Sequence, residues 1–326
     1  MNCLYCGRPI DGSASDEEKN AGWHSKCIRD FFGTEVMPDI CVSNKDLEKM
    51  AMSAVSKGLT VPGVQKKLSL HLSTEKKARL TIVDYPTGYI LKPQTKEFEY
   101  LPEAEKMCMD MAEATGIKTV PNGLIRIGQD DEGCAYITKR IDRTIEDGSR
   151  DQNTKMFAME DFCQLSERPT QDKYKGSYEK CAGIIKKYDV NRGLSLSELF
   201  LRIVFSFVTG NSDMHLKNFS LIEASPGGRE FSLSAAYDMI PVNIVMPEDD
   251  EELALTLNGK KKRIKKEDFF KFADKCSMPK KAADKILGKV VSLKKTYMEI
   301  CDRSYISGEM KKAMKELIDC RINVIS

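Results

Sequence analysis

The sequence has no long apolar run, no pronounced net charge and no repeated or low-complexity segment. Its longest apolar stretches, such as Leu199–Val208, are interrupted by charge and too short to cross a bilayer, so we expect no membrane span. No basic stretch followed by an apolar one opens the chain, which predicts no secretory signal and a cytoplasmic location. The 51 basic against 49 acidic residues give no general case for direct binding of nucleic acid.

One local exception is the basic run Lys260–Lys266. Our favoured interpretation is a solvated turn and helix start that leads into the acidic Glu267. The alternative is a patch for a phosphate backbone or an acidic partner.

The 11 cysteines are an odd number, and most stand singly in apolar patterns, so a disulfide framework is not expected. The exception is Cys3-x-x-Cys6 followed by His24-x-x-Cys27. Two such pairs form a closed Cys₃His set, which predicts structural rather than catalytic zinc, because four protein ligands leave no open position. Iron is chemically possible, and the alternative is four residues without a metal.

The pattern of apolar residues predicts strands and one amphipathic helix in the first half, and mainly helices beyond about residue 145. Pro102 opens that helix and Gly116 stops it. The predicted strands are Gln65–Leu72, Leu80–Asp84, Tyr89–Lys92, Leu124–Ile127 and Cys134–Arg140, with a later hairpin of Phe219–Glu223 and Glu230–Ala235. This is an α+β, two-lobe plan, for which we predict boundaries of 1–40, 41–144 and 145–326.

A polar loop follows the strongly apolar helix predicted for Ser195–Thr209, which ends at Gly210. Asp213 and Asn218 stand in the pattern Asp-x-x-x-x-Asn, and Asp238 follows the hairpin. Phosphoryl transfer needs a carboxylate that receives the proton of the attacking hydroxyl, together with an amide oxygen and a second carboxylate that hold Mg²⁺. The combination therefore indicates a phosphotransferase, although each acidic residue alone could simply cap a turn.

Several further segments occur in one order along the chain. They are TVPGVQKKLSL, YILKPQ, LPEAEKMCMDMA, YITKRIDR, MEDFCQL, KYKGSYE, GNSDMHLKNFSL and LSAAYDMI. With them, roughly residues 57–242 resemble the HipA-like Ser/Thr kinase toxins, and the compact form is most similar to the short HipT branch. The resemblance implies a protein-kinase-like fold, ATP and Mg²⁺.

The resemblance also implies a role for each matched residue. Asp213 is expected to be the catalytic base with His215 and Lys217 in support, and Asn218 and Asp238 are expected to hold Mg²⁺. The residues expected to contact the nucleotide are Thr60, Gly63, Val64, Gln65, Lys92, Lys139, Ile141 and Asp142. Among them, Lys139 and Ile141, with Arg140, would form the hinge whose backbone meets the adenine, and Asp142 would reach the ribose. Glu105 is a candidate to orient Lys92. In the family a hydroxyl residue of the phosphate loop is autophosphorylated, and Thr60 matches it; a phosphate there would repel those of ATP. Taken alone, Arg140 and Arg143 could simply pair with Asp142 and Glu146.

By the same resemblance, the expected substrate is an aminoacyl-tRNA synthetase, and the expected partners are HipS-like and HipB-like antitoxins. Full-length HipA has an extra N-terminal subdomain that is not recognised in this sequence, which favours a separate HipS-like protein. Two alternatives remain: a small-molecule kinase of the same fold, and a zinc-knuckle regulator with a degenerate kinase fold. The intact set of Lys92, Asp213, Asn218 and Asp238 argues against the second alternative.

Overall fold

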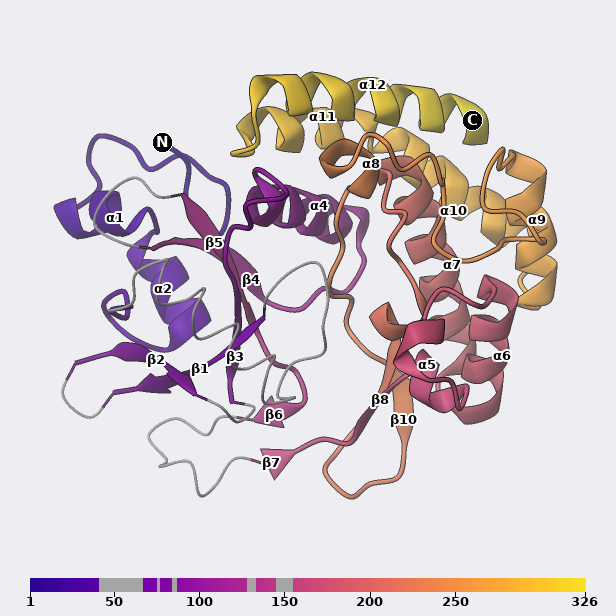
Figure 1. Ribbon diagram of the computed structural model, residues 1–326, viewed down its shortest axis with the longest axis horizontal. Coiled ribbons are helices and arrows are strands. Elements are labelled where there is room, and N and C mark those ends of the chain that lie inside the picture. The colour runs from indigo at the N-terminus through magenta and orange to yellow at the C-terminus, as the bar shows by residue number, and fades with distance from the viewer. Residues whose placement is uncertain (41–66, 75–76, 84–86, 128–132, 145–154) are drawn as a thin grey trace. The chain divides into compact units, whose positions relative to one another are not determined.

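The computed structural model describes residues 1–40, 67–74, 77–83, 87–127, 133–144 and 155–326 (Figure 1). Contacts between residues divide the chain into two compact units. The first unit contains Met1–Lys106, Val120–Lys155 and Arg303–Tyr305, and the second contains Met107–Thr119, Met156–Asp302 and Ile306–Ser326. The predicted α+β class is confirmed, because a sheet dominates the first unit and helices dominate the second.

An antiparallel five-stranded sheet of order β2-β1-β3-β5-β4 forms the centre of the first unit. Its strands are β1 (Leu68–Ser73), β2 (Arg79–Val83), β3 (Tyr89–Lys92), β4 (Asn122–Arg126) and β5 (Cys134–Lys139). Buried leucines alternate with more exposed residues in β1, whereas β3 and β5 are buried along most of their length, as befits central strands. All five predicted strands are present, and β3 has the predicted bounds.

The N-terminal segment packs against the edge of this sheet. It contains α1 (Asp16–Ala21) and α2 (Ser25–Phe32). The backbone N–H of Leu124 in β4 donates to the carbonyl of Leu4 at 3.0 Å, and the indole of Trp23 donates to the carbonyl of Leu124 at 2.8 Å. Gly123 permits this approach, because a Cβ there would lie 2.7 Å from the Trp23 ring. The segment thus covers an edge strand whose backbone groups would otherwise lack partners.

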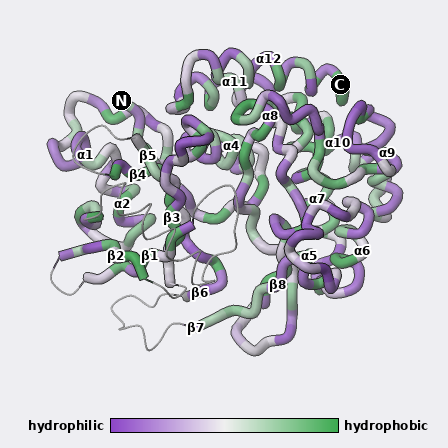
Figure 2. The backbone as a smooth tube through the Cα atoms, in the orientation of Figure 1, coloured by the Kyte–Doolittle hydropathy of each residue, from purple (hydrophilic) through white to green (hydrophobic). Residues whose placement is uncertain are grey.

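The second unit is built around α7 (Arg192–Thr209), in which every residue from Leu199 to Thr209 is buried. It is contacted by α6 (Tyr178–Tyr188), α9 (Lys266–Lys275), α10 (Lys280–Ser292) and α12 (Gly308–Ile325). Phe200 stacks on Phe272 of α9 with ring centroids 6.1 Å apart. Figure 2 shows hydrophobic and hydrophilic residues interleaved along α12, the pattern of a helix with one face in the core. The predicted core helix is confirmed, and it begins at Arg192, three residues before Ser195.

The strands outside the five-stranded sheet are short, and the other helices vary in length. The strands are β6 (Arg143–Thr144), β7 (Lys155–Met156), β8 (Met159–Asp161), β9 (Ser220–Glu223) and β10 (Phe231–Leu233). The helices are α4 (Leu101–Thr115), α5 (Phe162–Leu165), η2 (Thr170–Asp172), α6 (Tyr178–Tyr188), η3 (Leu216–Asn218), α8 (Val242–Val245), α9 (Lys266–Lys275), α10 (Lys280–Ser292), α11 (Lys294–Arg303) and α12 (Gly308–Ile325).

Two strands of the second unit differ from the prediction. The hairpin of β9 and β10 is present, but β10 is shorter than the predicted Glu230–Ala235. A third strand, β8, joins this sheet and was not predicted. Its three residues are too few to show an alternating pattern.

Among the described residues, none of the helices is long and apolar enough to span a membrane.

Candidate functional site

The polar loop lies between the end of α7 and β9, and two asparagines hold it in shape. Helix α7 ends at Gly210, whose φ of 69° lies in the left-handed region that favours glycine. The side-chain oxygen of Asn211 accepts from the backbone N–H of Asp213 at 3.3 Å, and the Asn218 amide donates to the carbonyl of Asp213 at 2.9 Å. The backbone at Asp213 is therefore fixed from both sides, and Asn211 and Asn218 are buried.

The carboxylate of Asp213 is partly exposed and has two neighbours on its Oδ1 atom. The hydroxyl of Tyr174 donates to this oxygen, and Nε2 of His215 lies 3.8 Å from it. The rings of Tyr174 and His215 meet edge to face with centroids 4.9 Å apart. Burial, followed by the charge of Asp213, raises the pKa of Tyr174 well above its ordinary value, so this phenol stays protonated and donates.

Lys217 contacts a carboxylate of the protein. Its ammonium lies 2.9 Å from Oδ2 of Asp161, which also caps α5 through the backbone N–H of Gln164 at 2.8 Å. The carboxylate thus links the loop to the start of α5.

Asp238 stands shortly after β10 with a φ of 61°, in the left-handed region. Aspartate and asparagine tolerate this region better than other side chains, and such backbone conformations often occur at functional sites. The hydroxyl of the preceding Tyr237 bonds the hydroxyl of Ser220 at 2.5 Å and donates to the carbonyl of Lys217 at 3.1 Å. These contacts link the segment that contains Asp238 to Lys217, the residue before Asn218. The side-chain oxygens of Asn218 and Asp238, an amide and a carboxylate, are ligands suited to Mg²⁺.

Lys92 and Glu105 form a buried ion pair in the first unit. Nζ of Lys92 at the end of β3 lies 2.5 Å from Oε1 of Glu105 on α4, and the two side chains are 4% and 0% exposed. The same ammonium lies 5.1 Å from the centroid of the Tyr136 ring. The structure therefore brings together the two residues that the sequence analysis paired.

The predicted hinge residues have partners of their own. Lys139 lies over the rings of Phe31 and Tyr89, at 5.5 and 6.0 Å from their centroids. Asp142 accepts from the guanidinium groups of both Arg140 and Arg143, at 2.7 and 3.0 Å, which is the simple pairing considered as an alternative to ribose binding. Ile141 follows β5 directly. Thr60, Gly63, Val64 and Gln65 lie outside the described residues.

The four predicted metal ligands lie together near the N-terminus. One ligand atom from each of Cys3, Cys6, His24 and Cys27 lies within 4.8 Å of all the others. Nδ1 of His24 faces the sulfurs, at 3.4 Å from Sγ of Cys6, and its Nε2 lies 3.2 Å from the carbonyl of Pro9. A carbonyl on Nε2 favours the tautomer that leaves Nδ1 free to bind a metal. Burial and the neighbouring thiols raise the pKa of Cys27, a cost that a bound cation would relieve.

Three lysines of the basic run pair with carboxylates of the same unit. Lys260 binds Asp268 and Lys261 binds Glu251, each at 2.9 Å, and Lys262 binds Asp250. Helix α9 begins at Lys266. This favours the turn and helix start over a patch for nucleic acid.

Sequence comparison gives the relatives of the chain. The family described as HipA-like C-terminal domain matches residues 59–297. A Haemophilus influenzae protein named "Putative kinase" is 25% identical over 267 residues, which cover 76% of each chain. A Sinorhizobium fredii protein named "Putative kinase Y4dM" is 30% identical over 239 residues, which cover 68% of this chain and 54% of the relative.

Two solved structures share the fold. A HipA structure, from the complex of Shewanella oneidensis HipA, HipB and operator DNA, matches with a TM-score of 0.68 and 18% identity, over 81% of this chain and 64% of the other. The Helicobacter pylori proinflammatory kinase CtkA matches with a TM-score of 0.52 and 15% identity, over 78% and 93%. The chain thus spans less than two thirds of the Shewanella protein. Because the family match covers well over half of the sequence, the protein belongs to the HipA-like family and has its kinase-like fold, as the sequence motifs predicted.

Proposed function

We propose that this chain is an ATP- and Mg²⁺-dependent Ser/Thr protein kinase. The observation that carries the proposal is the Asp213 carboxylate, which projects from a loop that Asn211 and Asn218 brace on both sides. A general base must keep its position while substrates exchange. This loop is held in place between a buried helix and a strand, which meets that need.

In this proposal each residue has one role. Asp213 orients the acceptor hydroxyl and receives its proton, and His215 supports the position of that carboxylate. Lys92, held by Glu105, contacts the phosphates of ATP. Asn218 and Asp238 would hold Mg²⁺, which neutralises charge on the phosphates when it is bound. Lys217 fixes the loop through Asp161. Thr60, Gly63, Val64 and Gln65 would cover the nucleotide, and Lys139, Ile141 and Asp142 would meet its base and ribose.

Substrate, partners and regulation are proposals at a finer level. We propose an aminoacyl-tRNA synthetase as the acceptor, HipS-like and HipB-like antitoxins as partners, autophosphorylation at Thr60, and a cytoplasmic location. Membership of the HipA-like family supports them, and the related Shewanella structure is a complex of HipA with HipB and operator DNA. Zinc at Cys3, Cys6, His24 and Cys27 would be structural, since it would have four protein ligands.

The test is transfer of radiolabelled phosphate from ATP in cell lysate by wild type and by Asp213→Asn. We expect label on a discrete protein band, absent with Asp213→Asn and retained with Asp284→Asn, which alters an exposed carboxylate of α10. Label confined to the low-molecular-weight fraction would instead favour the small-molecule kinase. No transfer by wild type to any acceptor would favour the zinc-knuckle regulator. Mass spectrometry of the protein itself, with Thr60→Ala as the control, tests autophosphorylation.

A further inference from the structure

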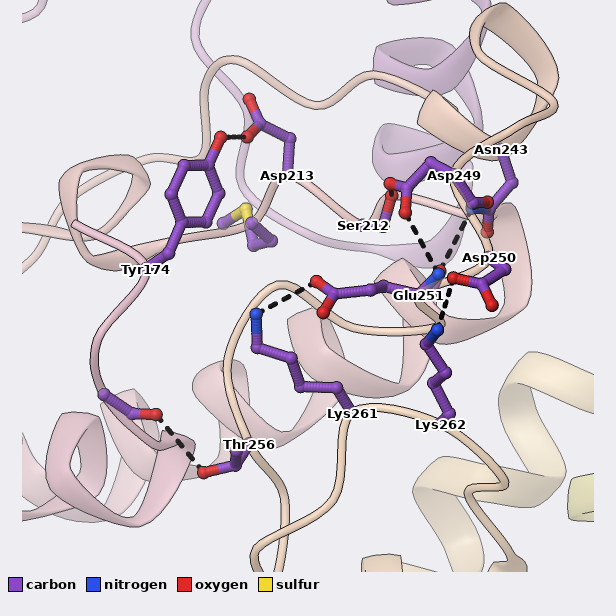
Figure 3. Close-up of polar contacts among 12 residues, drawn as sticks. Tyr174, Ser212, Asp213, Asn243, Asp249, Asp250, Glu251, Thr256, Lys261 and Lys262 are labelled. Atoms are coloured by element: carbon purple, nitrogen blue, oxygen red, sulfur yellow. Dashed lines mark hydrogen bonds and ion pairs between the residues drawn. The ribbon is translucent and has the colours of Figure 1, made fainter. Parts of the chain in front are cut away.

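A chain of contacts begins at Ser212 and returns to its neighbour Asp213 (Figure 3). The Ser212 hydroxyl donates to Oδ2 of Asp249 at 2.5 Å, and Oδ1 of Asp249 accepts from the backbone N–H of Glu251 at 3.0 Å. The Glu251 carboxylate pairs with Lys261 at 2.9 Å. Nζ of Lys261 lies 5.9 Å from the centroid of the Tyr174 ring, and the Tyr174 hydroxyl donates to Asp213. We call Tyr174, Asp249, Glu251 and Lys261 the brace.

The brace is itself anchored to the scaffold that carries the loop. The amide of Asn243, in α8, donates to the carbonyls of Asp249 and Glu251 at 2.8 and 3.0 Å. The backbone N–H of Asn243 donates to the carbonyl of Gly210 at 3.1 Å. Asn243 therefore links the Asp249–Glu251 segment to Gly210, the residue that precedes the polar loop.

Tyr174 is only partly buried, and several contacts hold its ring. Its residue is 40% exposed, so the hydrophobic effect alone does not fix its position. The His215 ring meets the Tyr174 ring edge to face, and the ammonium groups of Lys173 and Lys261 lie 4.9 and 5.9 Å from the centroid of the Tyr174 ring. Cation–π contacts at exposed sites are individually weak, but together they favour one orientation of the ring.

We propose that Tyr174 is a positioning residue for Asp213. The other residues of the brace set the orientation of the Tyr174 ring. The asparagines fix the backbone of Asp213, whereas the hydrogen bond from Tyr174 acts on the carboxylate itself and favours one of its rotations. The phenol keeps its proton throughout. The acceptor oxygen bonds to the γ-phosphorus of ATP while the bond from that phosphorus to ADP breaks, so ADP leaves and the acceptor's proton goes to the Asp213 carboxylate. This inference rests on the proposed kinase function and adds a residue to it.

The kinetic test compares Tyr174→Phe with Tyr188→Phe, a tyrosine of the same unit that is also 40% exposed and has Lys187 over its ring at 4.7 Å. Loss of one hydrogen bond to a charged group predicts a fall in kcat of roughly 10- to 100-fold with the KM for ATP unchanged. Tyr188→Phe is expected to leave both constants unchanged. Lys261→Met should lower kcat a few-fold, whereas Lys262→Met, at the neighbouring exposed pair, should not.

A second readout does not depend on catalysis. In protein labelled with ¹³Cζ-tyrosine, the resonance assigned by Tyr174→Phe should titrate well above the ordinary tyrosine pKa of about 10. Asp213→Asn should lower that pKa, because the carboxylate charge contributes to it. A wild-type kinase whose kcat survives Tyr174→Phe, or a Tyr174 pKa indifferent to Asp213→Asn, would overturn the positioning role and leave the kinase proposal standing. Absence of phosphoryl transfer by wild type would remove both proposals, and the titration would still show whether the contact exists.

Discussion

Lys92 and Glu105 place their charged atoms 2.5 Å apart in a part of the first unit where neither side chain has appreciable contact with water. Two opposite charges buried together are tolerated, but removal of one leaves the other desolvated and no longer balanced by it. Because Lys92 is also the residue proposed to bind the phosphates of ATP, its substitution should affect both the stability of the protein and its activity.

The first prediction separates these two effects. Lys92→Met should lower the free energy of unfolding by about 3–5 kcal/mol and abolish phosphoryl transfer. The double variant Lys92→Met/Glu105→Leu should recover most of the stability, because an apolar pair replaces the ion pair, but no activity. Urea unfolding and phosphate transfer are the measurements.

Lys262→Met serves as the control, because its ion pair with Asp250 is exposed and should contribute little to stability. A double variant as unstable as the single one would contradict the account of the ion pair. Activity in the double variant would contradict the role of Lys92.

The second prediction concerns the backbone of Asp238, whose φ is 61°. Asp238→Asn should fold with near wild-type stability, since asparagine tolerates this conformation, and should lose roughly two orders of magnitude in kcat with a higher Mg²⁺ requirement. Asp238→Ala should lose activity equally and also about 1–2 kcal/mol of stability. Thermal unfolding and Mg²⁺ titrations of the rate would measure both effects. Equal stability of the two variants would show that the backbone conformation carries no strain.

Local spacing explains what was predictable in the site. Asp213 and Asn218 are five residues apart on one loop, so their side chains could be assigned to one place before any fold was known. Lys92 and Glu105 are 13 residues apart, across a strand and the helix that follows it, and the order of the motifs was enough to pair them.

Contacts between distant parts of the chain could not be predicted in this way. Tyr174 is 39 residues from Asp213, and Asp161 is 56 from Lys217. The segment KYKGSYE was recognised only as part of the family order, and no local pattern reveals that its first tyrosine, Tyr174, would reach the polar loop. Contacts of this kind depend on how α5 and the Asp249–Lys262 segment pack on the polar loop. The residue type at a single position does not determine that packing.

The third prediction is a dependence of stability on pH that arises from Glu103. This residue, in the first turn of α4, is 7% exposed, and its Oε2 has no hydrogen-bond partner among the described residues. Burial raises its pKa from 4.5 to about 7. The folded protein therefore binds this proton more tightly than the unfolded chain does, so the free energy of unfolding falls as the pH rises from about 4.5 to 7.

At about 1.4 kcal/mol per pKa unit the Glu103 contribution is on the order of 3 kcal/mol across that window. Glu103→Gln should flatten the pH dependence measured by urea unfolding, whereas Glu113→Gln, at an exposed position of the same helix, should leave the slope unchanged. A slope in Glu103→Gln equal to that of wild type would rule out Glu103 as its source.

The fourth prediction uses the single tryptophan of the chain as a reporter of the metal site. Trp23 precedes the ligand His24, is fully buried, stacks on Tyr5 with centroids 5.0 Å apart and donates to Leu124 of the sheet. If zinc holds the segment in shape, its removal should release Trp23 into water. We expect a single zinc ion per chain by elemental analysis and a red shift of the tryptophan emission on chelation.

Substitution of a ligand should reproduce the effect of chelation. Cys27→Ser should bind zinc weakly and show the red-shifted emission without a chelator, while Cys320→Ser, at an exposed thiol outside the cluster, should behave as wild type. Because Trp23 also bonds the edge of the sheet that carries Lys92, loss of the metal should lower the stability of the first unit. A tryptophan that stays buried in metal-free purified protein would show that packing alone stabilises the segment. If the cluster instead binds iron, absorption of the iron–thiolate complex in the visible range distinguishes that metal from zinc.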